Sequence, residues 1–263
     1  MGSSLRRNML LIEAIVNQET LQQGGTGVVR LAELAGLDKS QASRALRSLE
    51  IAGLVQRDPH TLEYRLGWRL PSLMLATKSA RVLQFAHETM RTLCSMYPET
   101  VEYFCVLRDD RVHALYSVAA DGSTKKHPWV ADGAPCYCTS TGRALLCDLD
   151  VYQLREEYPA GLELAEGSLS PIRTVEQLAS ALKEVRSDGY AAVDSELESG
   201  LAGVAAPIRE FGGKVVAAIN VSGVALAESP RLRRARLAEV GQSTAQLCAR
   251  ISARLGWTKY TTS

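Results

Sequence analysis

The chain has 263 residues, of which 46% are hydrophobic, so it is long enough for one large domain or two modest ones. With 30 Lys and Arg against 29 Asp and Glu, its formal net charge of +1 excludes a chain that is basic overall, and any nucleic-acid surface must be a local patch. No apolar run reaches the roughly 18 residues needed to cross a bilayer, so we expect a cytoplasmic protein with no membrane partner.

The N-terminal region begins with two predicted helices. Apolar residues recur at helical spacing over residues 5–16, which predicts the first helix. A glycine-rich stretch follows, and Val28 and Val29 beyond it are expected to form a short strand. The second predicted helix covers residues 31–35 and ends at Gly36.

The third predicted helix has the clearest start in the sequence. Asp38 can accept hydrogen bonds from the free amides of the first turn while Gln41 reaches back, a variant of the capping box, and Gly53 ends the helix after about residue 52. A short turn thus separates two helices, as in a helix-turn-helix that places its second helix in the major groove of DNA. The expected inward stripe is Ala42, Ala45, Leu46, Leu49 and Ile51 or Ala52. The opposite face carries donors suited to bases and phosphates: Lys39, Ser40, Gln41, Ser43, Arg44 and Arg47.

A hairpin is predicted directly after this helix, because residues 54–57 and 62–66 alternate like strands around a turn-forming segment at 58–61. Such a hairpin is the wing of a winged helix-turn-helix, and its donors for flanking phosphates or the minor groove are Arg57, His60 and Arg65. We therefore predict a DNA-binding domain over residues 1–69 with double-stranded operator DNA as its partner. A solvated helix face in a dimerisation or scaffold module is the competing interpretation.

Beyond the wing, Pro71 suits the first turn of a helix over residues 72–94, and we predict that residues 70–84 form a linker helix. The second domain is expected over residues 85–263. Strand-like runs predict two hairpins, at 101–107 with 112–118 and at 203–208 with 215–221. Helical patterns cover 141–148, 175–187 and 231–255. This order predicts an α+β fold in which helices flank an antiparallel sheet.

Four stretches of the chain occur in a characteristic order. The first is LAELAGLDKSQASRALRSLEIAGLVQRDPHTLEYRLGWRL, followed by CTSTGRALL, SDGYAAVDSELESGLAGVAAPI and VVAAINVSG. Together they resemble the IclR family of bacterial transcriptional regulators over nearly the whole chain, from Leu5 to Trp257. The resemblance implies a winged helix-turn-helix followed by a GAF-like effector-binding domain. Because operator half-sites lie about one helical turn apart, we expect a homodimer or a homotetramer.

In that family the effector lies in a cup between a loop of small residues before a helix and the facing strands. Carried onto this sequence, the resemblance implies an effector site made of Tyr137, Thr139, Ser140, Thr141, Gly142, Asp194, Glu196, Leu201, Gly203, Asn220 and Ser222. Free amides and hydroxyls at a helix start suit a carboxylate, a carbonyl or a similar polar head. The competing interpretation is that the strand residues satisfy sheet edges and the acidic residues form a solvated loop.

Several positions depart from the usual family pattern. Tyr137 replaces a common His, Thr141 a common Leu or Ala, Val193 a common acidic residue, and Gly203 a frequent Cys, which would enlarge the cup. Our hypothesis for the effector is an aromatic acid or a related aromatic amide or hydrazide. It rests on the added hydroxyls and on four aromatic residues near the expected site: Tyr103, Tyr116, Trp129 and Tyr137.

The predicted function is that of a DNA-binding transcriptional regulator, with a repressor of a catabolic operon favoured, that responds to a small-molecule effector. We expect no catalytic residue, because no histidine lies in a nucleophile elbow and Gly24-Gly25-Thr26-Gly27 lacks the ending of a phosphate loop. A small-molecule hydrolase is the least favoured alternative.

The six cysteines are scattered along the chain, which is typical of a protein in a reducing compartment. Among them, Cys136, Cys138 and Cys147 lie closest together in the sequence. Structural zinc prefers more widely spaced ligand pairs and no histidine nearby completes a set, so we expect no metal and no cofactor. A regulator that senses oxidation through one of these thiols remains an alternative.

Overall fold

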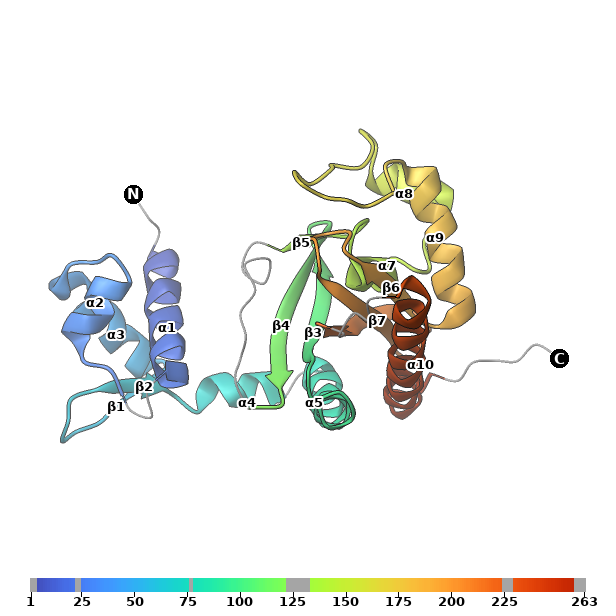
Figure 1. Cartoon of the computed structure of the whole chain (residues 1–263). Coiled ribbons are helices and arrows are strands. Elements are labelled where there is room, and N and C mark those ends of the chain that lie inside the picture. Colours follow the sequence, from blue (N-terminus) through green and yellow to red (C-terminus); the bar gives the residue numbers. More distant parts are fainter. Residues whose placement is uncertain (1–3, 22–24, 76–77, 122–132, 224–228, 258–263) are drawn as a thin grey trace. The chain divides into compact units, whose positions relative to one another are not determined.

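The chain divides into two compact units, Met1–Arg81 and Val82–Ser263, called unit 1 and unit 2 (Figure 1). The computed structural model describes residues 4–21, 25–75, 78–121, 133–223 and 229–257. Within these ranges no helix is both long enough and apolar enough to span a membrane.

Unit 1 is a three-helix group followed by a hairpin and a short helix. Its elements are α1 (Ser4–Leu21), α2 (Val28–Leu34), α3 (Lys39–Ile51), β1 (Val55–Arg57), β2 (Tyr64–Leu66) and α4 (Arg69–Leu75). The two strands pair antiparallel, with Gln56 opposite Arg65. Leu11, Leu31 and Leu46, one from each of the first three helices, are fully buried and form the centre of the core. The predicted winged helix-turn-helix is confirmed.

Two local predictions in unit 1 are wrong, and one open alternative is decided. Val28 and Val29 form the first turn of α2 and no strand, because the Leu31 amide bonds to the Gly27 carbonyl and so starts the helix there. Ile51 is 81% exposed whereas Ala52 is half-buried, so Ala52 is the better of the two alternatives for the end of the inward stripe of α3. Asp38 caps α3, but within the described hydrogen bonds the Gln41 side chain does not complete a capping box.

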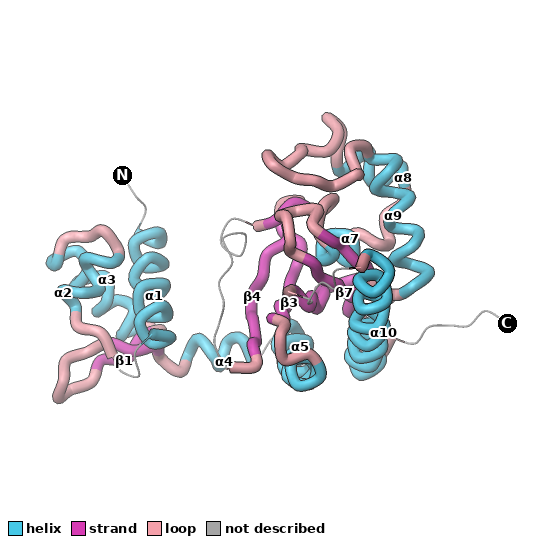
Figure 2. The backbone as a smooth tube through the Cα atoms, in the orientation of Figure 1, coloured by secondary structure: helices cyan, strands magenta, loops and turns pink. Residues whose placement is uncertain are grey.

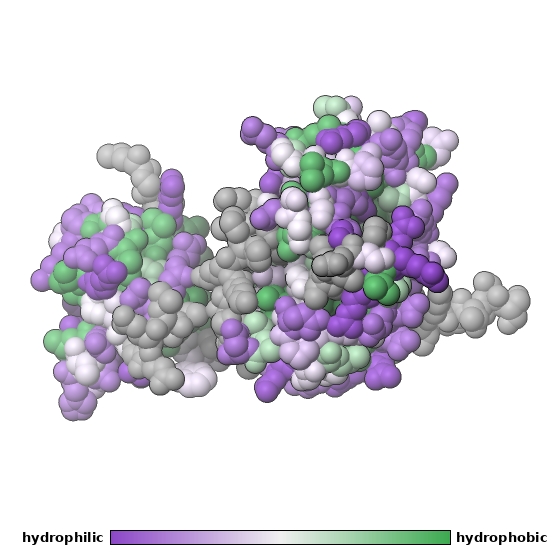
Figure 3. Space-filling view, in the orientation of Figure 1, coloured by the Kyte–Doolittle hydropathy of each residue, from purple (hydrophilic) through white to green (hydrophobic). Residues whose placement is uncertain are grey.

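The apolar pattern that predicted α1 extends beyond its buried face. Leu11 and Ile15 are fully buried, whereas Leu5, Met9 and Val16 are 71%, 46% and 40% exposed. Figure 3 shows hydrophobic residues at the surface of unit 1 among mostly hydrophilic ones. The helical spacing of apolar residues thus predicted the helix correctly, but it did not identify the face that packs on the core.

The helix predicted over residues 72–94 corresponds to two described helices. α4 already begins at Arg69, and α5 covers Lys78–Met96, while residues 76–77 between them lie outside the described residues. Pro71 lies in the first turn of α4, where the missing N–H of proline leaves no helical hydrogen bond unmade.

Unit 2 is built on a six-stranded sheet in the order β5-β4-β3-β8-β7-β6, in which every neighbouring pair is antiparallel. Figure 2 shows strands of this sheet in magenta and the helices of the unit in cyan. The strands are β3 (Val101–Arg108), β4 (Arg111–Ala119), β5 (Ala134–Pro135), β6 (Ala191–Asp194), β7 (Ala202–Arg209) and β8 (Val215–Ser222). The helices are α5, α7 (Ser140–Leu145), α8 (Val151–Glu157), α9 (Val175–Asp188) and α10 (Pro230–Arg254). The predicted α+β fold is confirmed.

Each face of the sheet has its own core, because side chains alternate along every strand. Val204 and Ile219 pack with α5 and α10, whereas Ala205 and Ala218 pack on the other side with α7 and α9. The face under α7 is lined with small residues. This leaves space between the sheet and the start of α7.

Three elements of unit 2 are absent from the predictions, and one helix is shorter than predicted. α8, β5 and β6 were not predicted, although Asp150 starts α8 with a complete capping box. α7 ends at Leu145, three residues short of the predicted end at 148. Trp129, one of the aromatic residues behind the effector hypothesis, lies outside the described residues.

Candidate DNA interface and effector cavity

The start of α3 is fixed by Asp38. Its carboxylate accepts hydrogen bonds from the amides of Ser40 and Gln41, each at 2.9 Å, and from the Ser40 hydroxyl at 2.7 Å. The Gln41 amide and the Ser40 hydroxyl lower the pKa of this exposed carboxyl, so it stays ionised at neutral pH. The negative charge at the helix N-terminus stabilises the helix that carries the predicted DNA contacts.

The outer face of α3 is polar and basic, as predicted. Lys39, Ser40, Ser43, Arg44 and Arg47 are exposed and Gln41 is half-buried. Ala42, Leu46 and Leu49 occupy the opposite, buried face. Ser40, Arg44 and Arg47 follow the spacing that places side chains on one side of a helix. Both arginines are exposed, and the Nε of Arg44 donates to the Ser40 carbonyl at 3.3 Å.

The wing carries its three predicted donors at the surface. Arg57 lies over the ring of Tyr64, 5.5 Å from the centroid, and its Nε donates to the Leu62 carbonyl at 3.4 Å. Asp58 accepts from the amides of His60 and Thr61 and so shapes the turn. The side chains of Arg57, His60 and Arg65 are all exposed. Arg57 is thus held along the hairpin.

Unit 2 contains a cavity of about 40 Å³ between the sheet, the start of α7 and the loop after β6. Seven of the predicted effector residues line it: Thr139, Ser140, Thr141, Leu201, Gly203, Asn220 and Ser222. Five further lining residues were not predicted: Val112, Ala134, Cys138, Val193 and Leu197. The lining therefore combines hydroxyls and an amide with an apolar wall, and none of these side chains is charged.

The predicted site residues Tyr137 and Gly142 lie outside the cavity lining and contribute to packing. Tyr137 is 3% exposed, and its hydroxyl accepts from the Ala165 amide at 2.8 Å. A Cβ at Gly142 would lie 2.2 Å from the Cα of Cys136, so α7 approaches the preceding loop too closely for any other residue. Thr139 lines the cavity, but its hydroxyl donates to the Pro135 carbonyl and caps the Gly142 amide.

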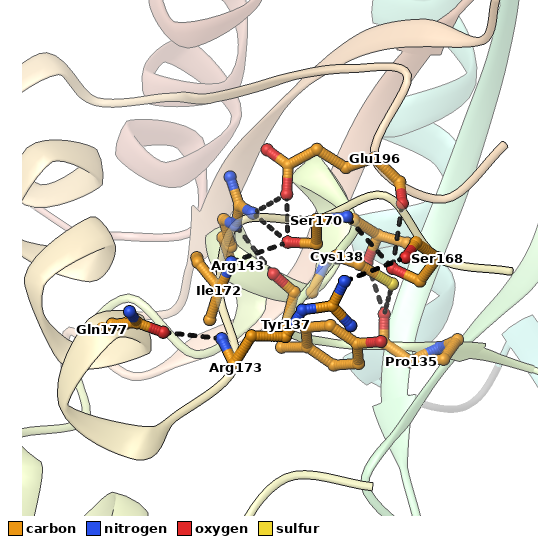
Figure 4. Close-up of polar contacts among 12 residues, drawn as sticks. Pro135, Tyr137, Cys138, Arg143, Ser168, Ser170, Ile172, Arg173, Gln177 and Glu196 are labelled. Atoms are coloured by element: carbon orange, nitrogen blue, oxygen red, sulfur yellow. Dashed lines mark hydrogen bonds and ion pairs between the residues drawn. The ribbon is translucent and has the colours of Figure 1, made fainter. Parts of the chain in front are cut away.

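Asp194 and Glu196 also lie outside the lining, and each forms an ion pair. Asp194 pairs with Arg233 of α10 at 3.2 Å. Glu196 accepts from Arg143 and from the Ser170 hydroxyl, and Arg143 Nε also donates to the Tyr137 carbonyl at 2.9 Å (Figure 4). These acidic residues anchor the start of the loop that carries Leu197.

The aromatic residues invoked for the effector are not grouped around the cavity. Tyr103 is fully buried in the core under α7 without lining the cavity. Tyr116 lies 5.4 Å from the ring of His87, a residue of α5, and so packs on the other side of the sheet. Tyr137 is used in packing. The aromatic part of the effector hypothesis therefore gains no support from these side chains.

The thiols close to the cavity are buried, and burial raises their pKa values. All six cysteines are free and buried. Burial raises the pKa of Cys136 to about 12 and also raises that of Cys138. A protonated, buried thiol is a poor nucleophile, which argues against the redox alternative. Within the described residues no group of three or more His, Cys, Asp or Glu is placed to hold a metal ion.

The family is decided by sequence profiles that cover both units. Residues 74–253 match the profile described as "Bacterial transcriptional regulator IclR C-terminal", and residues 19–59 match the IclR helix-turn-helix domain. The chain belongs to the IclR family. The Pca regulon regulatory protein of Pseudomonas putida is 28% identical to this IclR protein, over 84% of this chain and 74% of its own length. The expected resemblance is confirmed, and the chain is a DNA-binding transcriptional regulator.

Solved IclR structures share the fold. The IclR of Thermotoga maritima matches with a TM-score of 0.65 at 21% identity, covering 96% of this chain and 98% of its own. An IclR homologue from Microbacterium hydrocarbonoxydans, solved with 4-hydroxybenzoate, matches with a TM-score of 0.63 at 22% identity, covering 94% and 100%.

Proposed function

We propose that this IclR protein binds an operator through α3 and the wing, and that a small-molecule effector in the unit 2 cavity changes this binding. The observation that carries the proposal is the cavity itself, where buried hydroxyl and amide groups from the start of α7 and from β8 converge with an apolar wall. Small-molecule sites commonly combine such a wall with a few convergent polar groups. The effector then acts by binding more tightly to the protein in one arrangement of its DNA-binding domains than in another.

The proposed working unit is a homodimer or a homotetramer on a pseudo-palindromic site. α3 enters the major groove of each half-site, and Arg57 and Arg65 of the wing contact flanking phosphates. We propose that residues 70–84, which include parts of α4 and α5, form the linker that transmits the effector signal. The target is proposed to be a catabolic operon that this protein represses, and the Pca regulon regulatory protein among its relatives supports regulation of a gene set.

The proposed effector is a small aromatic acid or one of its amide or hydrazide derivatives. The relative solved with 4-hydroxybenzoate supports this class. A cavity must have a volume of about 10–15 Å³ to hold one water molecule. The cavity of about 40 Å³ therefore has room for a polar head group and little more. An aromatic ring would have to displace the wall formed by Leu197 and Leu201, which belong to the loop after β6.

The test of operator binding is a gel shift with the DNA upstream of the gene at low salt. Arg44→Ala and Arg47→Ala are expected to abolish the shift while the circular dichroism spectrum stays unchanged, because both side chains are exposed. Arg155→Ala, on the surface of unit 2, is the matched control and should bind normally. Normal shifts from both α3 variants would refute the DNA interface.

The test of effector control repeats the shift with substituted benzoates, their amides and aliphatic oxo-acids. We expect at least one aromatic compound to change the concentration of wild-type protein at which half of the operator DNA is shifted. If no compound changes operator binding, the effector proposal fails while the DNA proposal stands.

A further inference from the structure

Among the described residues, one buried polar side-chain atom of the cavity lining has no hydrogen-bond partner. Asn220 is 4% exposed, and its Nδ2 donates to the Ser140 hydroxyl at 3.1 Å and to the Val204 carbonyl at 3.2 Å. Its Oδ1 is buried and accepts no hydrogen bond from any described residue. An unmade hydrogen bond of a buried amide oxygen is costly, so the site is complementary to a donor that arrives with a ligand.

The orientation of this amide is fixed by its neighbours. A backbone carbonyl can only accept, so the NH₂ group of Asn220 must face Val204, and Oδ1 must be the atom left over. Ser140 Oγ already accepts from Asn220, which leaves the hydroxyl proton of Ser140 to donate. The cavity therefore offers one acceptor and one donor from adjacent side chains.

The charges around the cavity disfavour an anion. No lining side chain is charged. Arg143, the buried cation nearby on α7, is engaged by Glu196, Ser170 and the Tyr137 carbonyl. A carboxylate has only acceptors, so it would meet Oδ1 of Asn220 with a lone pair and would lose its hydration without a counter-charge.

We propose that the cavity recognises a neutral carboxamide-type head group, in which an N–H donates to Asn220 Oδ1 and the carbonyl accepts from the Ser140 hydroxyl. A primary amide and a hydrazide both carry this pair, whereas a carboxylate and an ester carry no N–H. The inference rests on the proposed function of the cavity, and it selects the amide or hydrazide branch of the proposed effector class.

The experiment is calorimetry on the full-length protein with matched probes. Benzamide, benzoate and methyl benzoate share one ring, and the ester is neutral but lacks the N–H. Propionamide and propionate form a second pair that needs less room. We expect each amide to bind at least about tenfold more tightly than its acid, and benzamide about tenfold more tightly than methyl benzoate, the value of one hydrogen bond.

Two variants assign the preference to its atoms. Asn220→Leu should bind benzamide and methyl benzoate equally, because the acceptor is gone. Ser140→Ala should weaken both about equally, because both use their carbonyl there. Ser180→Ala, an exposed change on α9, is the control and should keep the wild-type ranking. If Asn220→Leu does not fold by circular dichroism, the ligand series on the wild-type protein decides.

The possible outcomes separate this inference from the proposed function. If an acid binds as tightly as its amide in either pair, or if no amide binds, the inference is overturned. If benzoate then still changes operator binding in the gel shift, the proposed effector control survives. If no compound changes operator binding although the amides bind with the expected ranking, the inference survives and the proposed control fails.

Discussion

Arg143 on α7 and Glu196 in the loop after β6 form an ion pair whose side chains are only 8% and 13% exposed. Ser170 donates to the same carboxylate, and Ser168 donates to the backbone carbonyl of Glu196 at 2.9 Å. The pair thus joins three separate segments of the chain beside the cavity wall (Figure 4). Breaking it leaves a buried charge without its partner.

Arg143→Met is expected to destabilise the protein by about 3–5 kcal/mol, because removing one partner of a buried ion pair leaves the other uncompensated. Chemical denaturation of the full chain measures this. The exposed pair of Arg155 and Glu176 gives the matched control, in which Arg155→Met should cost about 0–1 kcal/mol. Equal losses from the two variants would mean that burial of the first pair has no energetic weight.

Arg65→Ala in the wing is expected to weaken operator binding by a similar factor on every DNA sequence and to lower the salt slope by about one. The exposed side chain of Arg65 is proposed to meet a phosphate, which carries no sequence information. Binding measured by fluorescence anisotropy over a salt series provides both quantities. A loss confined to one operator sequence would instead indicate contact with a base.

Glu102 on β3 predicts a pH-dependent contribution to stability. Its side chain is fully buried, Oε1 accepts from the Thr100 hydroxyl at 2.6 Å, and Oε2 has no partner among the described residues. Burial raises the pKa of this carboxyl above its usual 4.5, against the smaller opposing effect of Thr100. The folded state therefore prefers the protonated form, and this contribution is lost as the pH rises through the raised pKa.

Glu102→Gln is accordingly expected to raise the melting temperature at pH 7 and to leave it nearly unchanged at pH 4, where the wild-type carboxyl is protonated. Melting curves of both proteins across this range check the prediction. A stabilisation that is constant with pH would show that ionisation of Glu102 is not its cause.

Gly203→Ala is expected to destabilise the protein by about 1–3 kcal/mol through overpacking. A Cβ at this position would lie 2.8 Å from the Val221 carbonyl and 3.4 Å from the Ser222 hydroxyl, between β7 and β8. Gly212→Ala, in the β7–β8 turn, is the control because its added carbon meets nothing within 4 Å. If denaturation midpoints shift equally for both, the close approach of the strands at Gly203 is not what requires glycine there.

The sequence was sufficient to predict the winged helix-turn-helix and the antiparallel sheet. The reason is that Asp38, Gly53 and the wing turn are local signals, which act within a few residues of the elements they define. The wrong strand at Val28 and Val29 shows the limit of such reasoning. β-branched residues favour strands on their own, but the contacts of Leu31 in the core of unit 1 favour a helix there.

The candidate cavity was predicted less completely, because its residues come from distant segments. Family motifs pointed to Ser140 and Asn220, whereas Val112 on β4 and Ala134 on the edge strand β5 carry no sequence feature that distinguishes them from other core residues. In the sequence, Arg143 is distinguished only as the one charged residue of the short segment that forms α7. A charged residue in such a helix indicates a buried partner of opposite charge, but Glu196 is 53 residues away in the sequence and no local pattern identifies it as that partner.

All six cysteines belong to unit 2, and every one is buried, from Cys94 on α5 to Cys248 on α10. Because the thiols are buried, an alkylating reagent should react with them faster when this unit opens, and unit 1 has no cysteine that would add to the signal. The rate of thiol labelling therefore reports how often unit 2 opens. Slower labelling on addition of a small molecule would report its binding without any attached dye.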